Sequence, residues 1–454
     1  QGLKASQSAV PYQEKYFEVD IDHFNFHAGA PSSKTFQMRY LINQDNWDRA
    51  NAGPILFYCG NEGDITTFWE NTGFQTTTLA QEFKGLVLFA EHRYFGKSLP
   101  FGNDSFTNEN LAYLTTEQAL SDFVVFLRAF KSQIIQCEEC PVIAFGGSYG
   151  GMLAAWIRMK FPNVVDGAIA ASAPVVFFNS VTPLEEFNKI VTKDFKLTST
   201  PQCASIITEG MKRLDALIAN VSLANFDLIN KVVNPCDEIK DAAGITILQD
   251  WLSNAYVYMA MVQYPYETNF LTHMPGNPVN FACQAFAGLA PYNSDEEVYS
   301  AMVRAAKIYY DYDNITTCNK VNNSDSAGNI DGAGWNVLAC SEMILPMGSY
   351  GPNEDDMFPT RPWDYDSYSA MCNKTYSLQA RYTWALDFFG GWDYENDYRY
   401  YSNIFFSNGK LDPWSAGGVL KNISDSMKAY YIEGAAHHLD LRLPHPDDPA
   451  DVNL

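Results

Sequence analysis

A serine flanked by glycines is the first feature of this 454-residue sequence that is suited to catalysis. Ser148 lies in a Gly-x-Ser-x-Gly pattern within residues 146–151, after the apolar run 142–145 and before the helix-like run 152–156. Strand, turn and helix in this order form a nucleophile elbow, in which small residues let strand and helix approach closely. The hydroxyl then lies at the positive N-terminus of the helix. We therefore predict that Ser148 is a nucleophile.

The serine requires two partners, a histidine that takes its proton and a carboxylate that orients the histidine. In folds built on this elbow, the acid and then the histidine follow the serine along the chain. Asp412 comes just after the strand-like run 403–406, and His437 comes just after the run 429–432. The sequence therefore predicts a triad of Ser148, Asp412 and His437.

Other residues compete for the roles of acid and base. Asp425 falls in an apparent helix that bears a glycosylation sequon, and Asp440 is too close in sequence to His437 to face it easily. The alternative role for Asp412 is an ordinary helix cap. These considerations leave Asp412 as the preferred acid.

Three further basic residues have roles that the sequence leaves open. His438 is a candidate supporting residue that pairs with Arg442, and a solvated loop position is the alternative. His92 directly follows a strand-like run, where a structural hydrogen-bonding role is more common than a catalytic one.

An oxyanion hole requires two N–H donors, one of them from the residue after the nucleophile. That residue is Tyr149, and the loop after an early strand provides Gly60 and Gly63 as the second source. In the same loop, Asn61 and Glu62 are expected to lie near the substrate, and loop capping is the alternative for Glu62.

Two apolar residues lie next to the predicted triad in the sequence. Met152 follows the elbow, and Trp414 follows Asp412. We expect both side chains to line an apolar substrate pocket, and core packing is the alternative for each.

The elements that position these residues alternate between strand and helix. Strand-length apolar runs at 54–58 and 86–90 are typical of buried parallel strands, and apolar residues recur at helical spacing between 115 and 132. This alternation indicates an α/β fold.

The pattern changes in the middle of the chain. Residues 175–383 contain most cysteines, four sequons and helix-like runs such as 247–262, and the alternation returns afterwards. We expect an α/β-hydrolase core formed by residues 1–174 and 384–454, with a mainly helical domain, residues 175–383, inserted between its two parts.

Composition limits the classes of function. Thirty basic and 53 acidic residues give a formal charge of -23, which disfavours nucleic-acid and anionic-membrane partners and suits an acidic compartment. No apolar run reaches the roughly 18 residues of a membrane span. The sequence begins QGLKASQSAV, so we expect a secretory signal to have been removed already.

Nine cysteines lack the paired spacing of metal ligands, which favours disulfides in an oxidising compartment, and we expect neither a metal nor a cofactor. The CxxC of Cys137 and Cys140 is more typical of a local bridge or inert thiols than of redox chemistry. Sequons that agree with the secretory route occur at Asn103, Asn220, Asn314, Asn322, Asn373 and Asn422.

Many ordered stretches resemble the serine carboxypeptidase S28 family of lysosomal peptidases that act after proline. They include GNEGD at 60–64, GGSYGGML at 146–153, SNGKLDPW at 407–414 and AHHLDLR at 436–442. Shorter matches lie at 22–24, 89–94, 98–102, 171–174, 264–266 and 356–358. The resemblance therefore spans nearly the whole chain.

The resemblance implies a helical cap, called the SKS domain, over the active site and the same triad as above. It implies that Asp356 binds the substrate amine in the dipeptidases of the family, although the carboxypeptidases share this motif. It also implies three disulfides, which are Cys203 to Cys283, Cys236 to Cys318 and Cys340 to Cys372.

Two activities are compatible with the resemblance. The motifs favour release of N-terminal X-Pro dipeptides, as in dipeptidyl peptidase II, and the alternative is release of a C-terminal residue after proline, as in lysosomal Pro-X carboxypeptidase. A non-catalytic binding protein is a remote alternative. We expect peptide substrates with proline at the cleavage site, a lysosomal or secreted location and, from the resemblance, a possible homodimer.

Overall fold

The computed structural model describes residues 10–25, 34–322, 328 and 331–453, and its centre is a mixed sheet of eight strands. The strand order is β1-β2-β4-β3-β5-β6-β7-β8; the pairs β1–β2 and β2–β4 are antiparallel, and every pair from β4 to β8 is parallel. The strands are β1 Gln13–Asp20, β2 Thr35–Asn43, β3 Ile55–Cys59, β4 Leu86–Ala90, β5 Val142–Gly147, β6 Gly167–Ala171, β7 Ile404–Gly409 and β8 Met427–Ile432. The expected α/β-hydrolase fold is confirmed.

Helices cover both faces of this sheet, which is why its central parallel strands β3 and β4 are apolar throughout. Every residue of β3 and β4 is buried, and alternate side chains of β3 enter two different hydrophobic clusters. Helices α1 Ile65–Asn71, α3 Thr116–Ala129 and α4 Tyr149–Lys160 pack against the sheet. Helix α13, Trp384–Phe389, packs on α4, and the short α2, Ala80–Glu82, contributes Ala80 to one of the two clusters. The predicted helix between 115 and 132 is α3, capped by the Thr115 side chain.

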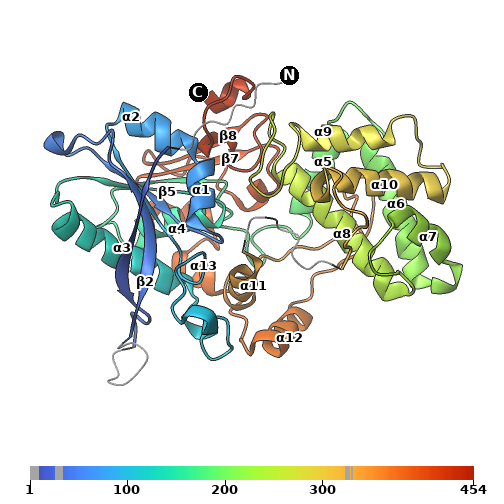
Figure 1. Ribbon diagram of the computed structural model, residues 1–454, viewed down its shortest axis with the longest axis horizontal. Coiled ribbons are helices and arrows are strands. Elements are labelled where there is room, and N and C mark those ends of the chain that lie inside the picture. Colours follow the sequence, from blue (N-terminus) through green and yellow to red (C-terminus); the bar gives the residue numbers. More distant parts are fainter. Residues whose placement is uncertain (1–9, 26–33, 323–327, 329–330, 454) are drawn as a thin grey trace.

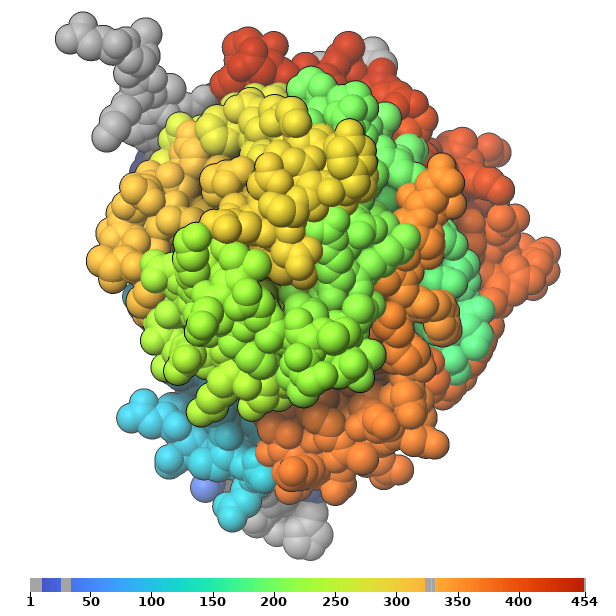
Figure 2. Space-filling model, turned by 90° about the vertical axis from the view of Figure 1, so that its right-hand side faces the viewer, coloured from blue at the N-terminus to red at the C-terminus, as the bar shows by residue number. Residues whose placement is uncertain are grey.

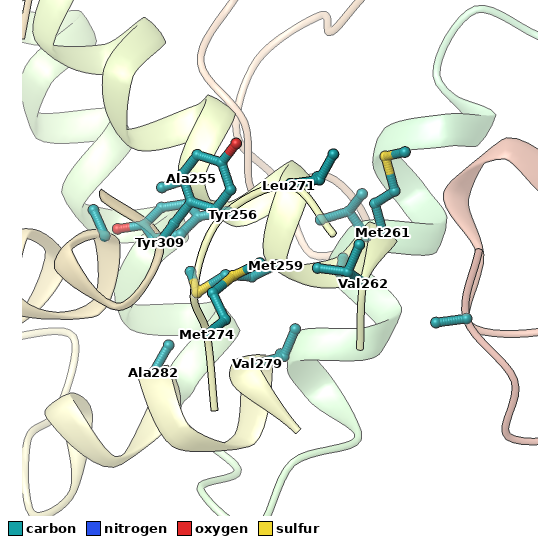
Figure 3. Packing of buried hydrophobic residues seen from close by; sticks show 14 of the residues in the cluster. Ala255, Tyr256, Met259, Met261, Val262, Leu271, Met274, Val279, Ala282 and Tyr309 are labelled. Carbon is teal, nitrogen blue, oxygen red and sulfur yellow. The ribbon is translucent and has the colours of Figure 1, made fainter. Parts of the chain in front are cut away.

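Between β6 and β7 the chain forms a separate group of helices, on the right of Figure 1 and facing the viewer in Figure 2. These are α5 Glu186–Lys196, α6 Cys203–Ala219, α7 Phe226–Val233, α8 Ala242–Met261, α9 Pro278–Cys283 and α10 Asp295–Tyr310. Their core is built around α8, where Tyr256 and Met259 pack near Met274 and Val279 (Figure 3). Among the described residues, we find no helix with the length and apolar character to traverse a bilayer.

The last part of the predicted insert returns to the sheet. Helix α11, Gly332–Ser341, contributes Val337 and Leu338 to the hydrophobic cluster that also contains α3 and α4. Helix α12, Tyr365–Tyr376, also belongs to this part of the insert, and α14, Tyr394–Asp397, follows after the predicted boundary. The domain boundaries at 174/175 and 383/384 stay predictions, because α11 belongs to the insert in sequence but packs with the core.

Disulfides connect the insert internally. The three implied bridges, Cys203–Cys283, Cys236–Cys318 and Cys340–Cys372, are all formed, and Cys137 is bonded to Cys140. Cys59 is an unpaired, buried thiol in β3. The CxxC is therefore a local bridge, as the sequence favours.

All six sequon asparagines are exposed, although Ser324 of the Asn322 sequon lies outside the described residues. Glycosylation at these positions stays a prediction. The helix expected around Asp425 is wrong, because residues 421–426 form bends that lead into β8.

Candidate active site

The turn between β5 and α4 has the strained backbone of a nucleophile elbow. Ser148 has φ 59° and ψ −128°, and its N–H donates to the carbonyl of Ala171 at 3.0 Å. A methyl group added at Gly146 would lie 2.0 Å from the carbonyl oxygen of Gly150. Strand and helix are therefore too close for any side chain at Gly146, which explains the doubled glycine before the serine.

Asp412 and His437 meet beyond the ends of β7 and β8. The ring Nδ1 of His437 lies 3.0 Å from each carboxylate oxygen of Asp412, and both residues are fully buried. Asp412 also caps a short helical turn, because its Oδ1 accepts the N–H of Trp414 at 3.0 Å. The two roles weighed for Asp412 are thus both filled by one side chain.

The loop that carries His437 is held by the helical insert. The His437 N–H donates to the carbonyl of Met261, the last residue of α8, at 3.0 Å, and the Tyr264 hydroxyl donates to the His437 carbonyl at 2.9 Å. The ring Nε2 is buried and has no hydrogen-bond partner in the described part of the chain. This nitrogen is therefore free to accept a proton.

A buried Asp–His pair after strands β7 and β8, with a serine at an elbow after β5, has the chain order and topology expected of a hydrolase triad. The structure brings Asp412 and His437 together, but no hydrogen bond between Ser148 and His437 is observed among the described residues, so the full triad stays a prediction. The profile of the family described as serine carboxypeptidase S28 matches residues 19–454. This chain belongs to that family.

Named relatives of this S28 peptidase align over nearly all of it. Lysosomal Pro-X carboxypeptidase of Mus musculus is 41% identical over 458 residues, with 100% of this chain and 89% of the relative covered. The protein of that name from Homo sapiens is 41% identical, with 98% and 86% covered. Prolyl carboxy peptidase like protein 5 of Caenorhabditis elegans is 38% identical, with 97% and 87% covered.

In this S28 peptidase, the predicted second source of oxyanion donors needs correction. The N–H of Gly60 donates to the Ala90 carbonyl at 2.9 Å, and the N–H of Gly63 donates to the Asn61 carbonyl at 2.8 Å. The prediction for Gly60 and Gly63 is therefore wrong, because neighbouring carbonyls already use both donors. The N–H of Asn61 has no hydrogen-bond partner among the described residues, and this loop lies against the elbow, since a methyl group at Gly150 would be 3.0 Å from the Asn61 side-chain oxygen.

Tyr149 begins α4 directly after Ser148, so its backbone N–H belongs to the first turn of that helix. Its side chain is buried, and the hydroxyl lies 2.9 Å from Oγ1 of Thr116 and 3.1 Å from Nε2 of His92. Burial lowers the pKa of His92 to about 4, so this histidine is neutral at physiological pH. His92 is thus a structural hydrogen-bonding residue.

Asn61 and Glu62 form a buried pair beside the triad. The Asn61 amide donates to the Glu62 carboxylate at 2.9 Å, and the Tyr58 hydroxyl donates to the Asn61 oxygen at 3.3 Å. Burial raises the pKa of Glu62, and the nearby charge of His437 acts in the opposite direction. Glu62 is therefore close enough to the triad to sense its charge, although contact with substrate stays a prediction.

The two predicted pocket walls differ. The Trp414 ring centre lies 6.5 Å from that of His437, and the indole packs edge to face on Phe187 and Phe177 at 4.9 and 5.7 Å. Met152 is fully buried in the cluster between α4 and the sheet. The structure therefore places an aromatic wall beside His437, but it does not place Met152 in a pocket, because helix register turns that side chain into the core.

Asp356 lies in the insert, where Oδ1 accepts the N–H of Phe358 at 3.0 Å and Oδ2 is buried without a partner in the described structure. Burial raises its pKa, and the charged groups of Glu185, just before α5, and of Lys189 on α5 are nearby. No contact between Asp356 and the triad is observed among the described residues, so its role as an amine anchor stays a prediction.

His438 and Arg442 lie together without the expected hydrogen bond. The His438 N–H donates to the Ser172 hydroxyl at 2.7 Å, and its ring packs edge to face on Phe270 with centres 5.1 Å apart. Arg442 instead stacks over Tyr264, 4.5 Å from the ring centre. Burial lowers the pKa of His438, and the charges of His437 and Arg442 lower it further. The two residues are neighbours, and their supporting role stays a prediction. The alternative, a solvated loop position for His438, is wrong, because this residue is 7% exposed.

Of the rival acids, Asp440 is half-buried and accepts a hydrogen bond from the Ser407 hydroxyl at 2.5 Å, so its carboxylate already has another partner. Sequence reasoning missed Asp194 of α5, which is buried with both carboxylate oxygens unpartnered within the described chain. Burial raises its pKa, and the charge of nearby Asp412 raises it further. Because Lys193 precedes it, Asp194 looks in sequence like part of a solvated helix face.

Proposed function

We propose that this protein is a serine carboxypeptidase that removes the C-terminal residue after a proline. The observation that carries the proposal is the 41% identity to mammalian lysosomal Pro-X carboxypeptidases over 98–100% of the chain. The motifs taken alone favour an N-terminal dipeptidase, whereas these relatives favour the alternative, and we adopt the alternative here.

In the proposed acylation step, Nε2 of His437 takes the proton from Ser148, and the serine oxygen attacks the proline carbonyl. Asp412 holds the imidazole in the tautomer that exposes Nε2 and stabilises the imidazolium that forms. The N–H groups of Tyr149 and Asn61 hold the oxyanion, in a buried site where such donors are most effective. His437 then gives its proton to the departing amine.

The C-terminal amino acid leaves, and the peptide remains as a prolyl ester on Ser148. Water, deprotonated by His437, hydrolyses this ester and restores the serine. The half-buried Trp414, supported by Phe177 and Phe187, offers the proline ring an apolar face beside His437.

Glu62 is the proposed contact for the terminal carboxylate of the substrate. Burial raises the pKa of this residue, which favours the neutral acid. A neutral carboxyl donates a hydrogen bond to a carboxylate, whereas an ionised one attracts an amine. Acidic conditions would therefore favour carboxypeptidase binding at this position.

The names of the relatives and the exposed sequons support a lysosomal or secreted location. Four disulfides support the same proposal, because such bonds persist in oxidising compartments. A homodimer stays a prediction.

Three substrates distinguish the two activities. We would compare a Lys-Pro amide with a free amine, its N-acetylated form and an N-blocked peptide that ends in Pro-Phe. The proposal predicts release of phenylalanine from the third substrate. Cleavage of the first substrate alone would support the dipeptidase and refute the carboxypeptidase.

A serine variant tests the chemistry separately from the substrate preference. Ser148→Ala is expected to lose at least about a thousandfold in kcat on the cleaved substrate, and labelling by a fluorophosphonate probe should disappear. Ser205→Ala, at an exposed position on α6, is the matched control and should retain both. Substantial turnover by Ser148→Ala would refute the mechanism.

A further inference from the structure

A buried carboxyl group behind the elbow has no role in the mechanism above. Glu342 follows α11 and is 1% exposed. Its Oε1 accepts the backbone N–H of Thr116 at 2.5 Å, and its Oε2 pairs with Arg381. Glu342 therefore connects the end of the insert to the first turn of α3.

A short chain of contacts leads from Glu342 to the residue after the nucleophile. The same Thr116 that donates its N–H to Glu342 places its hydroxyl 2.9 Å from the Tyr149 hydroxyl. From α11, Trp335 also packs against Tyr149, with ring centres 5.6 Å apart. The side chain of Tyr149 is thus fixed by Thr116, His92 and Trp335, and its backbone N–H is the first proposed oxyanion donor.

The groups that face Glu342 come from α3, from α4 and from the loop that contains Arg381. On α3, Glu117 lies close and shares Arg381, whose Nη1 donates to Glu117 at 3.3 Å. On α4, Tyr149 has its pKa raised by burial and by the charge of Glu342, with smaller effects of Glu62 and Glu117. Burial raises the pKa of Glu342 to about 7, the charge of Glu117 acts in the same direction, and Arg381 opposes both.

Arg381 is a partial counterion. Its side chain is 39% exposed and lines a surface cavity of about 580 Å³, where it stacks 4.6 Å from the ring centre of Trp384. Since solvent and two carboxylates share this guanidinium, ionised Glu342 is not fully neutralised. The charge of Glu342 therefore changes around neutral pH, since its pKa is raised to about 7.

We propose that Glu342 is a positioning residue for the oxyanion donor Tyr149, acting through Thr116, and that the reaction is faster when Glu342 is uncharged. The inference rests on the proposed function, because it assigns the Tyr149 N–H to the oxyanion. A negative charge behind that donor opposes the negative charge that develops on the substrate oxygen. The neutral acid keeps the hydrogen bond from Thr116 without this penalty.

The test is the pH dependence of single-turnover acylation between pH 4.5 and 9, measured on the cleaved substrate of the panel above. The wild-type rate should fall by roughly threefold to tenfold as the pH rises through about 7, where Glu342 loses its proton. Glu342→Gln should remove the fall, while KM stays within about twofold. A fall that persists unchanged in Glu342→Gln would overturn the proposal.

Two variants keep the test decisive if Glu342→Gln does not fold. Arg381→Gln removes the exposed counterion, so the fall should move to higher pH; an unmoved fall would refute the proposal. Tyr368→Phe removes a neighbouring bond, from the Tyr368 hydroxyl to the Ala339 carbonyl at 3.0 Å, and should leave the profile unchanged. An equal shift in Tyr368→Phe would show a general structural effect and would also refute it. If the proposal for Glu342 fails, the loss of activity in Ser148→Ala is still expected. The proposal for Glu342 and the proposed peptidase activity can therefore be refuted separately.

Discussion

The carboxylate of Asp412 is shared by two hydrogen-bonding partners. One oxygen accepts the Trp414 N–H, and both oxygens lie 3.0 Å from Nδ1 of His437. The hydrogen bond from Trp414 restricts rotation of the Asp412 carboxylate. The imidazole of His437 is therefore oriented by a group that is itself held in place. This is the preorganisation that a general base requires.

Asp412→Asn should therefore leave the fold in place and disable the histidine. The amide presents an N–H where Nδ1 needs an acceptor, and the imidazole is driven to the wrong tautomer. We expect kcat to fall by roughly 10³ to 10⁴, with a small change in KM. Steady-state kinetics on the cleaved peptide measure this, and near-UV circular dichroism checks the fold.

Asp425→Asn is the control, because Asp425 is a fully exposed rival acid whose side chain pairs only with Lys428, at 3.8 Å. It should retain wild-type kcat. Equal losses in the two variants would argue against Asp412 as the orienting acid.

At the scale of elements, the elbow depends on how closely β5 and α4 approach. The methyl group of Gly146→Ala would lie 2.0 Å from a backbone oxygen of α4, which no side-chain rotation relieves. We expect a loss of stability of at least about 1–3 kcal/mol and a displaced Ser148 with kcat reduced by tenfold or more. Chemical denaturation and kinetics measure the two effects.

Gly167→Ala in neighbouring β6 is the matched control, since the nearest atom to its added methyl group lies 3.4 Å away. This variant should stay within about 1 kcal/mol of wild type and keep its activity. Similar losses in both variants would mean that close approach is not what Gly146 provides.

Elements were predictable where one local pattern decides them. The runs 54–58 and 86–90 are apolar throughout because parallel strands are buried on both faces, and they became β3 and β4. Asp412 and His437 could be located because each follows a strand whose end lies at the same edge of the sheet. Both of these signals lie within a few residues of the feature they predict.

Features that depend on distant partners could not be predicted. The N–H of Gly60 donates to the carbonyl of Ala90, which lies 30 residues later in the chain. Asp194 is buried because α5 packs on the turn that follows Asp412. In the sequence, Glu342 is not distinguishable from an ordinary residue at a helix end. Its role depends on contacts with Thr116 and Arg381, which only the folded structure shows. Sequence spacing carries no record of such contacts.

At the scale of the whole molecule, a charge of -23 is combined with buried and half-buried carboxyl groups whose pKa values are raised by burial. These are Glu62, Glu91, Asp194, Glu342, Asp356, Asp440 and Asp448. As pH rises above about 4.5, the unfolded chain releases these protons before the folded protein does, so stability falls. Glu342, with a pKa of about 7, extends this fall to neutral pH.

Two histidines act in the opposite direction. The pKa of His92 is lowered to about 4, and that of His438 is also lowered, in both cases mainly by burial. Below about pH 6.5 these histidines bind protons in the unfolded chain but stay neutral in the folded protein. They therefore lower the stability of the folded protein as pH falls. Carboxylates with a lowered pKa, such as that of Asp64 beside Arg39, add a further loss of stability below about pH 4.

Because seven carboxyl groups with a raised pKa outnumber two histidines with a lowered pKa, we expect Tm to be highest near pH 5 and to fall by roughly 5 °C or more by pH 8. Differential scanning fluorimetry in buffers of constant ionic strength measures this profile. Glu342→Gln should reduce the fall, because one buried acid no longer ionises, whereas Glu296→Gln, at an exposed position, should not. If Tm instead rises between pH 5 and 8, the buried carboxyl groups do not govern the stability of this protein.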